Sequence, residues 1–105
     1  MMLVTTDAIA GREVEKVIGL VRGSSVRGAP ATEDLHAWLE NVVGGEIPEY
    51  TKLLAECRKQ ALDRLAAEAR ARGADAILGL RFVSSEIASG AAEFLAYGTA
   101  VKLRA

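Results

Sequence analysis

Two glycines stand a few residues before a helical pattern, in the segment NVVGGEIPEYTKLL at residues 41–54. Glycines ahead of a helix can leave backbone N–H groups free to bind a phosphate. The Walker pattern G-x-x-x-x-G-K-S/T is absent, however, and Pro48 removes one of the donors. Glu46 and Glu49 also place negative charge where a phosphate would lie. The segment therefore predicts a corner between two helices, not a nucleotide site.

His36 is the only histidine of the chain, with Glu33 and Glu40 three and four residues away. A metal site needs two or more such ligands at fixed spacing, as in H-E-x-x-H. The sequence offers no second histidine. We therefore interpret His36 as an exposed side chain near carboxylates, and the residues indicate no metal ligand.

The single cysteine, Cys57, falls on the apolar stripe of a predicted long helix, which is typical of a small core residue. A nucleophile would need a neighbouring base and some exposure, and the sequence indicates neither. The serines of GSSVRG, residues 23–28, lack the G-x-S-x-G spacing of a nucleophile elbow. These residues therefore predict no catalytic side chain.

Charge and composition narrow the class of protein further. Thirteen basic and fourteen acidic residues give a net charge of -1, and the balance predicts no basic face for nucleic acid. One cysteine excludes an internal disulfide and fits a reducing compartment. The N-terminal residues do not resemble a signal peptide, and no apolar run approaches the roughly 20 residues of a membrane helix. We expect a cytoplasmic protein without a membrane or nucleic-acid partner.

The apolar pattern predicts a single domain over residues 1–105 with the element order β-β-α-α-β-β. The expected elements are a short strand near Leu3–Thr5, a strand near Glu13–Arg22, a helix from Thr32 up to Gly44, a helix from Pro48 up to Gly73, and two hairpin strands over 74–85 and 92–104. Residues 23–31 are expected to form a loop, and Ser89–Gly90 a turn. This order indicates an α+β domain with helices on one side of a mainly antiparallel sheet.

Both faces of the predicted strands are apolar. In a regular pleat, Val17, Gly19 and Val21 share one face of the second strand, and Ile18 and Leu20 share the other. Gly19 can also mark a bulge or a close approach of another backbone. Small residues dominate one face of the last strand, which would let another surface come close. We therefore expect helices to cover one face of the sheet and another subunit to cover the other.

Five stretches occur in an order that resembles the YbjQ family of small proteins, which carry a heavy-metal-binding label: VTT, IGLVRG, VVGGEIPEY, RGADAILGL and YGTAVK. In that family VGG precedes the long helix, which agrees with a corner at Gly44 and Gly45. The resemblance implies a dodecin-like subunit that assembles as a homo-oligomer, with a pentameric ring as the expected form. Some relatives carry a cysteine in the first long strand, where Ile18 stands here.

The leading hypothesis is a cytoplasmic ring that binds a small ligand or a metal ion between its subunits. The alternative is an enzyme with its active site at the subunit interface, where Glu86, Tyr97 and Thr99 could meet. One histidine and one cysteine are too few ligands for a soft metal within one subunit, although symmetry would multiply each donor. The residues identify no reaction and leave the cofactor and the ligand open.

Overall fold

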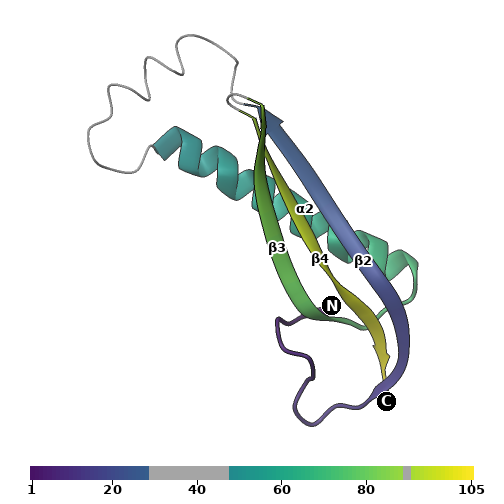
Figure 1. Ribbon diagram of the computed structural model, residues 1–105. Helices are drawn as coiled ribbons and strands as arrows, with labels where there is room; N and C mark the ends of the chain where they lie inside the picture. Colours follow the sequence, from purple (N-terminus) through teal and green to yellow (C-terminus); the bar gives the residue numbers. More distant parts are fainter. Residues whose placement is uncertain (29–47, 89–90) are drawn as a thin grey trace.

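The computed structural model describes residues 1–28, 48–88 and 91–105. Within these residues the chain forms four strands and one helix, which are β1 (Met2–Leu3), β2 (Val14–Gly28), α2 (Pro48–Ala71), β3 (Ala76–Ala88) and β4 (Ala91–Leu103) (Figure 1). The strand order in the sheet is β1-β3-β4-β2. β1 is parallel to β3, and the other two pairs are antiparallel. The predicted α+β class with a mainly antiparallel sheet is therefore confirmed.

Several predictions fall on residues that lie outside the described part of the chain. These are the first helix from Thr32, the glycine corner at Gly44 and Gly45, the position of His36, and the turn at Ser89–Gly90. The long helix α2 begins at Pro48 as predicted, where a missing N–H has no intrahelical partner to lose. It ends at Ala71, and Gly73 follows with a φ of 81°, the left-handed conformation that commonly terminates a helix.

The predicted loop over residues 23–31 is wrong in its first part, because β2 continues through Gly28. Residues 23–28 pair with β4 from Ala96 to Ala91. Gly23 is required for a reason other than a turn. A Cβ at this position would collide with the carbonyl oxygen of Ala61 and the backbone nitrogen of Leu65, so the glycine lets α2 cross close to the strand.

Helix α2 packs on one face of the sheet, mainly over β2 and β4 (Figure 1). Its buried stripe is formed by Cys57, Ala61, Leu65 and Ala69, which are all fully buried. The sheet contributes Val21, Ile77, Leu80, Ala96 and Ala100 to the same core. The alanines of β4 leave room for the helix backbone, so the predicted small-residue face is the face that α2 covers.

A β-bulge at Gly19 changes which residues share a face of β2. Gly19 has a φ of 133°, and the register with β4 shifts between Val17 and Gly19. Val17 and Leu20 therefore lie on the same face, whereas Ile18 and Val21 contact the helix-side core. The alternation expected for a regular pleat is thus wrong, while the bulge, one of the two readings of Gly19, is confirmed.

We call the sheet face turned away from α2 the open face. It is formed by Val17, Leu20, Arg22, Ser24 and Val26 of β2, by Arg81, Val83 and Ser85 of β3, and by Glu93, Leu95, Tyr97 and Thr99 of β4. Val4 and Ile9 of the N-terminal segment cover only the end where Ala76, Leu78, Val101 and Leu103 lie. The rest of this face has no layer over it within the described residues.

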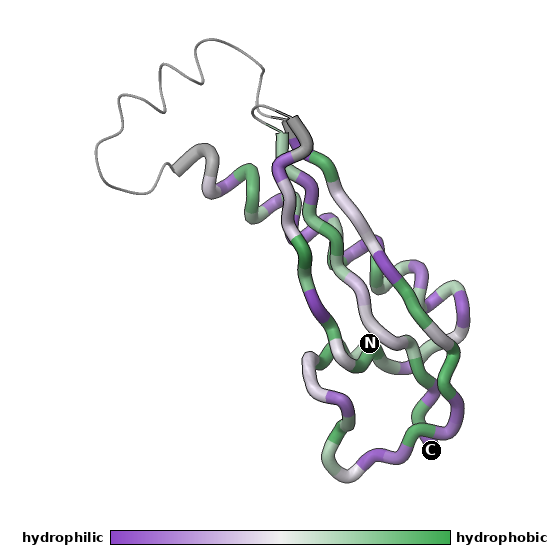
Figure 2. The backbone as a smooth tube through the Cα atoms, in the orientation of Figure 1, coloured by the Kyte–Doolittle hydropathy of each residue, from purple (hydrophilic) through white to green (hydrophobic). Residues whose placement is uncertain are grey.

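The described chain is elongated, with extents of 55 × 24 × 16 Å. Its radius of gyration is 17.3 Å, whereas a compact domain of this length has a value of roughly 13 Å. Hydrophobic residues recur along all three long strands, beyond the part that the helix covers (Figure 2). No helix of the described residues has the length and hydropathy needed to cross a membrane.

Candidate functional site

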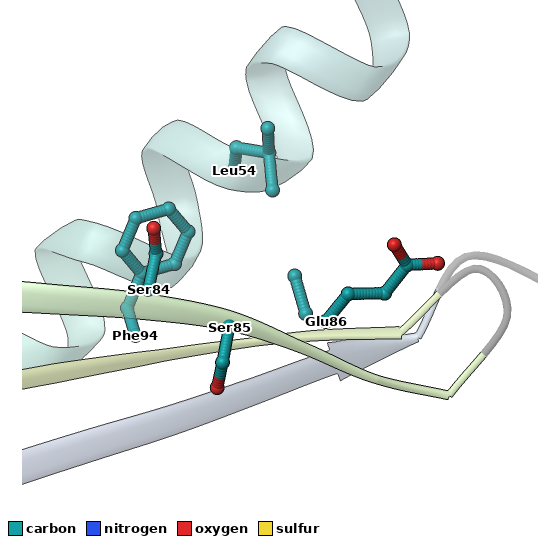
Figure 3. A pocket seen from close by; sticks show the side chains of 6 residues that line it. Leu54, Ser84, Ser85, Glu86 and Phe94 are labelled. Atoms are coloured by element: carbon teal, nitrogen blue, oxygen red, sulfur yellow. The ribbon is translucent and has the colours of Figure 1, made fainter.

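A pocket of about 210 Å³ lies between the first half of α2 and the end of the β3–β4 hairpin (Figure 3). Its walls are formed by Leu54, Ser84, Ser85, Glu86, Ala92 and Phe94. The Ser84 and Glu86 side chains lie on the side of the sheet that faces the helix, while the Ser85 hydroxyl points to the opposite side. The register agrees, because Ser84 pairs with Phe94 and Glu86 with Ala92.

The chemistry of this pocket is limited to one carboxylate and one hydroxyl beside apolar walls. Its volume is below the roughly 300–1,000 Å³ of common small-molecule sites. Acid–base catalysis needs a second titratable group or a substrate held within hydrogen-bonding distance. The described lining supplies no base or second acid beside Glu86. The pocket can therefore accept a small polar group, but a single chain does not assemble a catalytic pair there.

The three residues suggested for an interfacial active site do not come together in one chain. Glu86 lies on the helix side of the sheet, in the row of Ala92. Tyr97 and Thr99 lie on the open face, opposite to Ala96 and Ala100, which pack under the helix. The sheet itself separates the carboxylate from the two hydroxyl groups, so only residues of different subunits could unite them.

Cys57 is a core residue, as predicted. Its side chain is fully buried, and its Sγ donates a hydrogen bond to the carbonyl oxygen of Ser25 at 3.2 Å. The Ser25 hydroxyl is also buried and donates to Oε1 of Gln60. These bonds join α2 to β2 and leave the thiol without access to solvent.

The described residues of one chain do not fit a soft-metal centre. They contain no group of three or more histidine, cysteine, aspartate or glutamate side chains placed to hold a metal ion. The one thiol is enclosed in the core, where Cys57 already has a partner. Soft metals prefer several thiolate or imidazole ligands. A metal bound by this protein would therefore need donors from more than one chain or from residues 29–47.

The open face brings together two arginines that the sequence analysis did not single out. Arg22 of β2 and Arg81 of β3 are both paired in register with Tyr97 of β4. Arg81 is held in place, because its Nη1 donates to the carbonyl oxygens of Thr5 at 2.9 Å and Leu80 at 2.8 Å. The register depends on bulges in β2 and β3, so the sequence alone carries no signal for this row.

The outer edge of β2 is closed by side chains of α2. Arg72 donates to the carbonyl oxygens of Leu20 at 2.7 Å and Ile18 at 3.2 Å. One turn earlier, Oε2 of Glu68 accepts the backbone N–H of Arg22 at 3.0 Å. Another turn earlier, Arg64 donates to the Ser24 carbonyl oxygen at 2.6 Å. The helix thus satisfies backbone groups that an added strand would otherwise use.

Comparison with known proteins gives a family match over almost the whole chain. Residues 1–104 match the YbjQ family, described as "Putative heavy-metal-binding". A UPF0145 protein of Methanococcus maripaludis is 54% identical over 104 residues, which covers 99% of this chain and 93% of the relative. A UPF0145 protein of Photobacterium profundum is 48% identical over 103 residues, with 98% and 100% covered.

A solved structure shows the same fold. It is a protein of unknown function of the DUF74 family from Pediococcus pentosaceus, similar with a TM-score of 0.62 over 99% of this chain and 98% of that one. The sequences are 20% identical. At this distance the likeness concerns the fold alone.

Proposed function

The chain belongs to the YbjQ family, and we propose that it works as a homo-oligomer, a ring of five copies in the cytoplasm, with a small ligand or a metal ion bound between subunits. The number five comes from the family resemblance. Self-association is supported by the surface of the chain itself. The observation that carries it is the amount of apolar side chain left on the open face.

Four large apolar residues of the open face remain in water in the single chain. Val17, Leu20, Val26 and Val83 are 62%, 65%, 52% and 48% exposed. Exposed apolar side chains gathered on one surface are typical of a protein–protein interface. Each buried side chain of this size contributes about 1.5–3 kcal/mol when it leaves water completely. A second copy that covers this face would therefore gain substantially from these four residues.

The edge of β3 beyond Leu80, where the N-terminal segment no longer pairs with it, supports the same proposal by a separate route. Phe82 and Val83 are neighbours on this strand, so they lie on opposite faces of the sheet, and both are exposed at 42% and 48%. An element packed on one face could cover only one of them. A strand added beside β3 would place side chains next to both. Side chains of α2 close the β2 edge, and the N-terminal segment pairs with β3 as far as Leu80. Among the described strands, the part of β3 after Leu80 is therefore the edge that remains open to a second copy.

Placing the ligand between subunits follows from what one chain lacks. The pocket near Glu86 holds a single acid, and the described residues hold no metal-ligand cluster. A symmetric ring repeats every carboxylate, hydroxyl and carbonyl group around its axis. A ligand group that occurs once in each chain would thereby occur several times around the axis of the assembly.

Sedimentation of charged variants tests the proposed assembly. Leu20→Asp and Val83→Asp each place a carboxylate on the open face, and each should shift the protein from oligomer to single chain. Ala67→Asp is the matched control, because Ala67 is an exposed uncharged residue of α2 and its change should leave the mass unaltered. An unaltered mass in both open-face variants would contradict the proposal.

A separate measurement tests whether the ligand between subunits is a metal ion. Protein purified without an affinity tag is challenged with zinc or copper, and bound metal is determined by elemental analysis. A fixed ratio of metal to chain in the oligomer would identify a metal ion as the ligand between subunits. Absence of retained metal would exclude this class of ligand and leave a small molecule.

A further inference from the structure

The open face carries a row of three side chains that suits an oxyanion. Arg22, Tyr97 and Arg81 lie in one line across β2, β4 and β3, because each arginine pairs with the tyrosine in register. The spacing between neighbouring strands separates the Cα atoms of the two arginines by roughly 10 Å. Arg22 is exposed and free to lie over the tyrosine. The Arg81 guanidinium is bound to the carbonyl oxygens of Thr5 and Leu80, on the side of β3 that faces β1, and it would have to leave them to reach the same ligand. The planar guanidinium groups of the two arginines match the geometry of phosphate and carboxylate oxygens.

No described acidic residue forms an ion pair with the side chain of Arg22 or Arg81. The Glu68 carboxylate lies at the β2 edge, where it accepts the backbone N–H of Arg22. Ion pairs among the described residues join Lys59 to Asp63 and Arg104 to Glu13. Glu93 is the acid of the open face, and it lies four residues along β4 from Tyr97, roughly 13 Å away. Asp7 approaches Gly79 but makes no ion pair with Arg81. The two guanidinium groups are therefore left without an ion-pair partner in the described part of the chain.

Arg81 already has hydrogen-bond partners before any ligand arrives. Its Nη1 is occupied by the carbonyl oxygens of Thr5 and Leu80. The other guanidinium donors, on Nε and Nη2, have no hydrogen-bond partner among the described residues. An anion above Tyr97 would exchange the two carbonyl partners of Arg81 for charged oxygens, which make stronger hydrogen bonds.

The neighbours of the row explain why a ligand is required in the assembly. Leu20 and Val83 flank the arginines on β2 and β3, and both are exposed apolar residues. A second copy that covers them would also take Arg22 and Arg81 out of water. Burying unpaired charges is strongly unfavourable, so an anion must accompany the arginines.

We infer that Arg22, Tyr97 and Arg81 bind a phosphate- or carboxylate-bearing molecule, held where a second copy covers the open face. This names the ligand class for the proposed function and rests on that function for the position of the second copy. Two guanidinium groups repel a metal cation. A metal ion bound by the same protein would therefore occupy a different place.

Calorimetric titration of the full chain tests this assignment, with inorganic pyrophosphate as the phosphate probe and citrate as the carboxylate probe. Each titration is compared with potassium chloride at equal ionic strength. We expect saturable binding of at least one probe at millimolar concentration. Arg22→Gln and Arg81→Gln should each weaken it about tenfold, since hydrogen bonds to charged groups are the strong ones. Arg58→Gln, which alters an exposed arginine of α2, should leave the affinity unchanged.

Arg22→Gln is the cleaner of the two variants, because Arg81 also binds Thr5 and supports the fold. Circular dichroism confirms that each variant is folded before titration. Lack of saturable binding, or equal weakening by Arg58→Gln, would overturn the assignment. A third result would also overturn the assignment: the unaltered chain binds neither probe, and Arg22→Gln loses the oligomer. A carboxylate of the second copy would then be the counter-ion of Arg22.

Sedimentation of the same samples separates this inference from the proposed function. Saturable binding with the expected loss in both variants supports the ligand class whatever the mass. A single-chain mass in the presence of a bound probe would overturn the position between copies and the proposed assembly together. An oligomer that binds neither probe would overturn only the ligand class.

Discussion

The two faces of the sheet follow opposite rules of packing. On the helix side, β2 and β4 present Gly23, Ala96 and Ala100, and the backbone of α2 comes close enough that a single added Cβ at Gly23 would collide with it. On the open face, the same strands present Leu20 and Arg22, long side chains with no described layer above them. One face is completed by the chain itself. The other has the composition of a surface that is completed by another molecule.

The difference teaches that side-chain size, more than hydropathy, distinguishes the internal face of this sheet from the face proposed for assembly. Both faces are apolar enough to be buried. Small residues allow a close approach that a helix on the same chain can use, since the connection fixes its position. Large apolar residues mixed with arginine suit a contact that must be both stable and specific.

The largest effect is expected from Gly23→Val. The new side chain would meet the backbone of α2 at Ala61 and Leu65, and no rotamer change can relieve a contact with backbone. We expect a loss of at least about 4 kcal/mol in the free energy of unfolding, measured with urea. Gly11→Val is the contrast, because nothing lies within 4 Å of its Cβ position and only its positive φ of 77° opposes the change. Equal losses in the two variants would show that the close approach of α2 is not what requires Gly23.

The comparison of the two faces is sharpened by Leu65→Ala and Leu20→Ala. Leu65 is fully buried under the sheet, and its truncation should cost about 3 kcal/mol at every protein concentration. Leu20 is exposed in the single chain, so its truncation should act through assembly and grow smaller as the protein is diluted. Chemical denaturation at several protein concentrations distinguishes them. A loss for Leu20→Ala that does not depend on concentration would place Leu20 in an internal core.

A smaller effect is expected from Ser25→Ala, on the helix side. The Ser25 hydroxyl is buried and donates to Gln60, so its removal should cost about 1 kcal/mol in the free energy of unfolding. Ser24→Ala is the matched control, because the adjacent Ser24 side chain is exposed on the open face and should change stability very little. A larger loss for Ser24→Ala in the single chain would reverse the assignment of the two faces.

The smallest effect concerns the closed edge of β2. Glu68→Ala removes the acceptor of the Arg22 backbone N–H, so that amide should exchange with solvent roughly fivefold faster, which corresponds to a bond of about 1 kcal/mol. Hydrogen exchange followed by NMR measures this rate. Glu56→Ala, also on the exposed part of α2, serves as the control. An unchanged Arg22 rate would mean that this edge is covered by something other than Glu68.

Local signals in the sequence were sufficient for the helix and the hairpin. The stripe that contains Cys57 and Leu65 has helical spacing, and Pro48 and Gly73 mark its ends, so the helix and the burial of Cys57 were predicted correctly. The segment GSSVRG was wrongly predicted as a loop, because its glycine and serines are also typical of turns. Gly23 serves a contact with α2, far along the chain, that local composition does not reveal.

The candidate sites could not be predicted from the sequence, because they depend on the register between strands. The bulge at Gly19 was predicted, but its effect on the alternation of β2 was not, and the wrong alternation separated Val17 from Leu20. The row of Arg22 and Arg81 follows from pairing through β4, with register shifts in both outer strands. Such registers are set by the packed sheet as a whole.

Native mass spectrometry of the unaltered protein, without a tag and at micromolar concentration, tests the central claim most directly. The proposed assembly covers the open face with a second copy, so the spectrum should show a multiple of the 11.1 kDa chain mass, with five copies as the expected number. A spectrum dominated by the 11.1 kDa single chain would contradict the account.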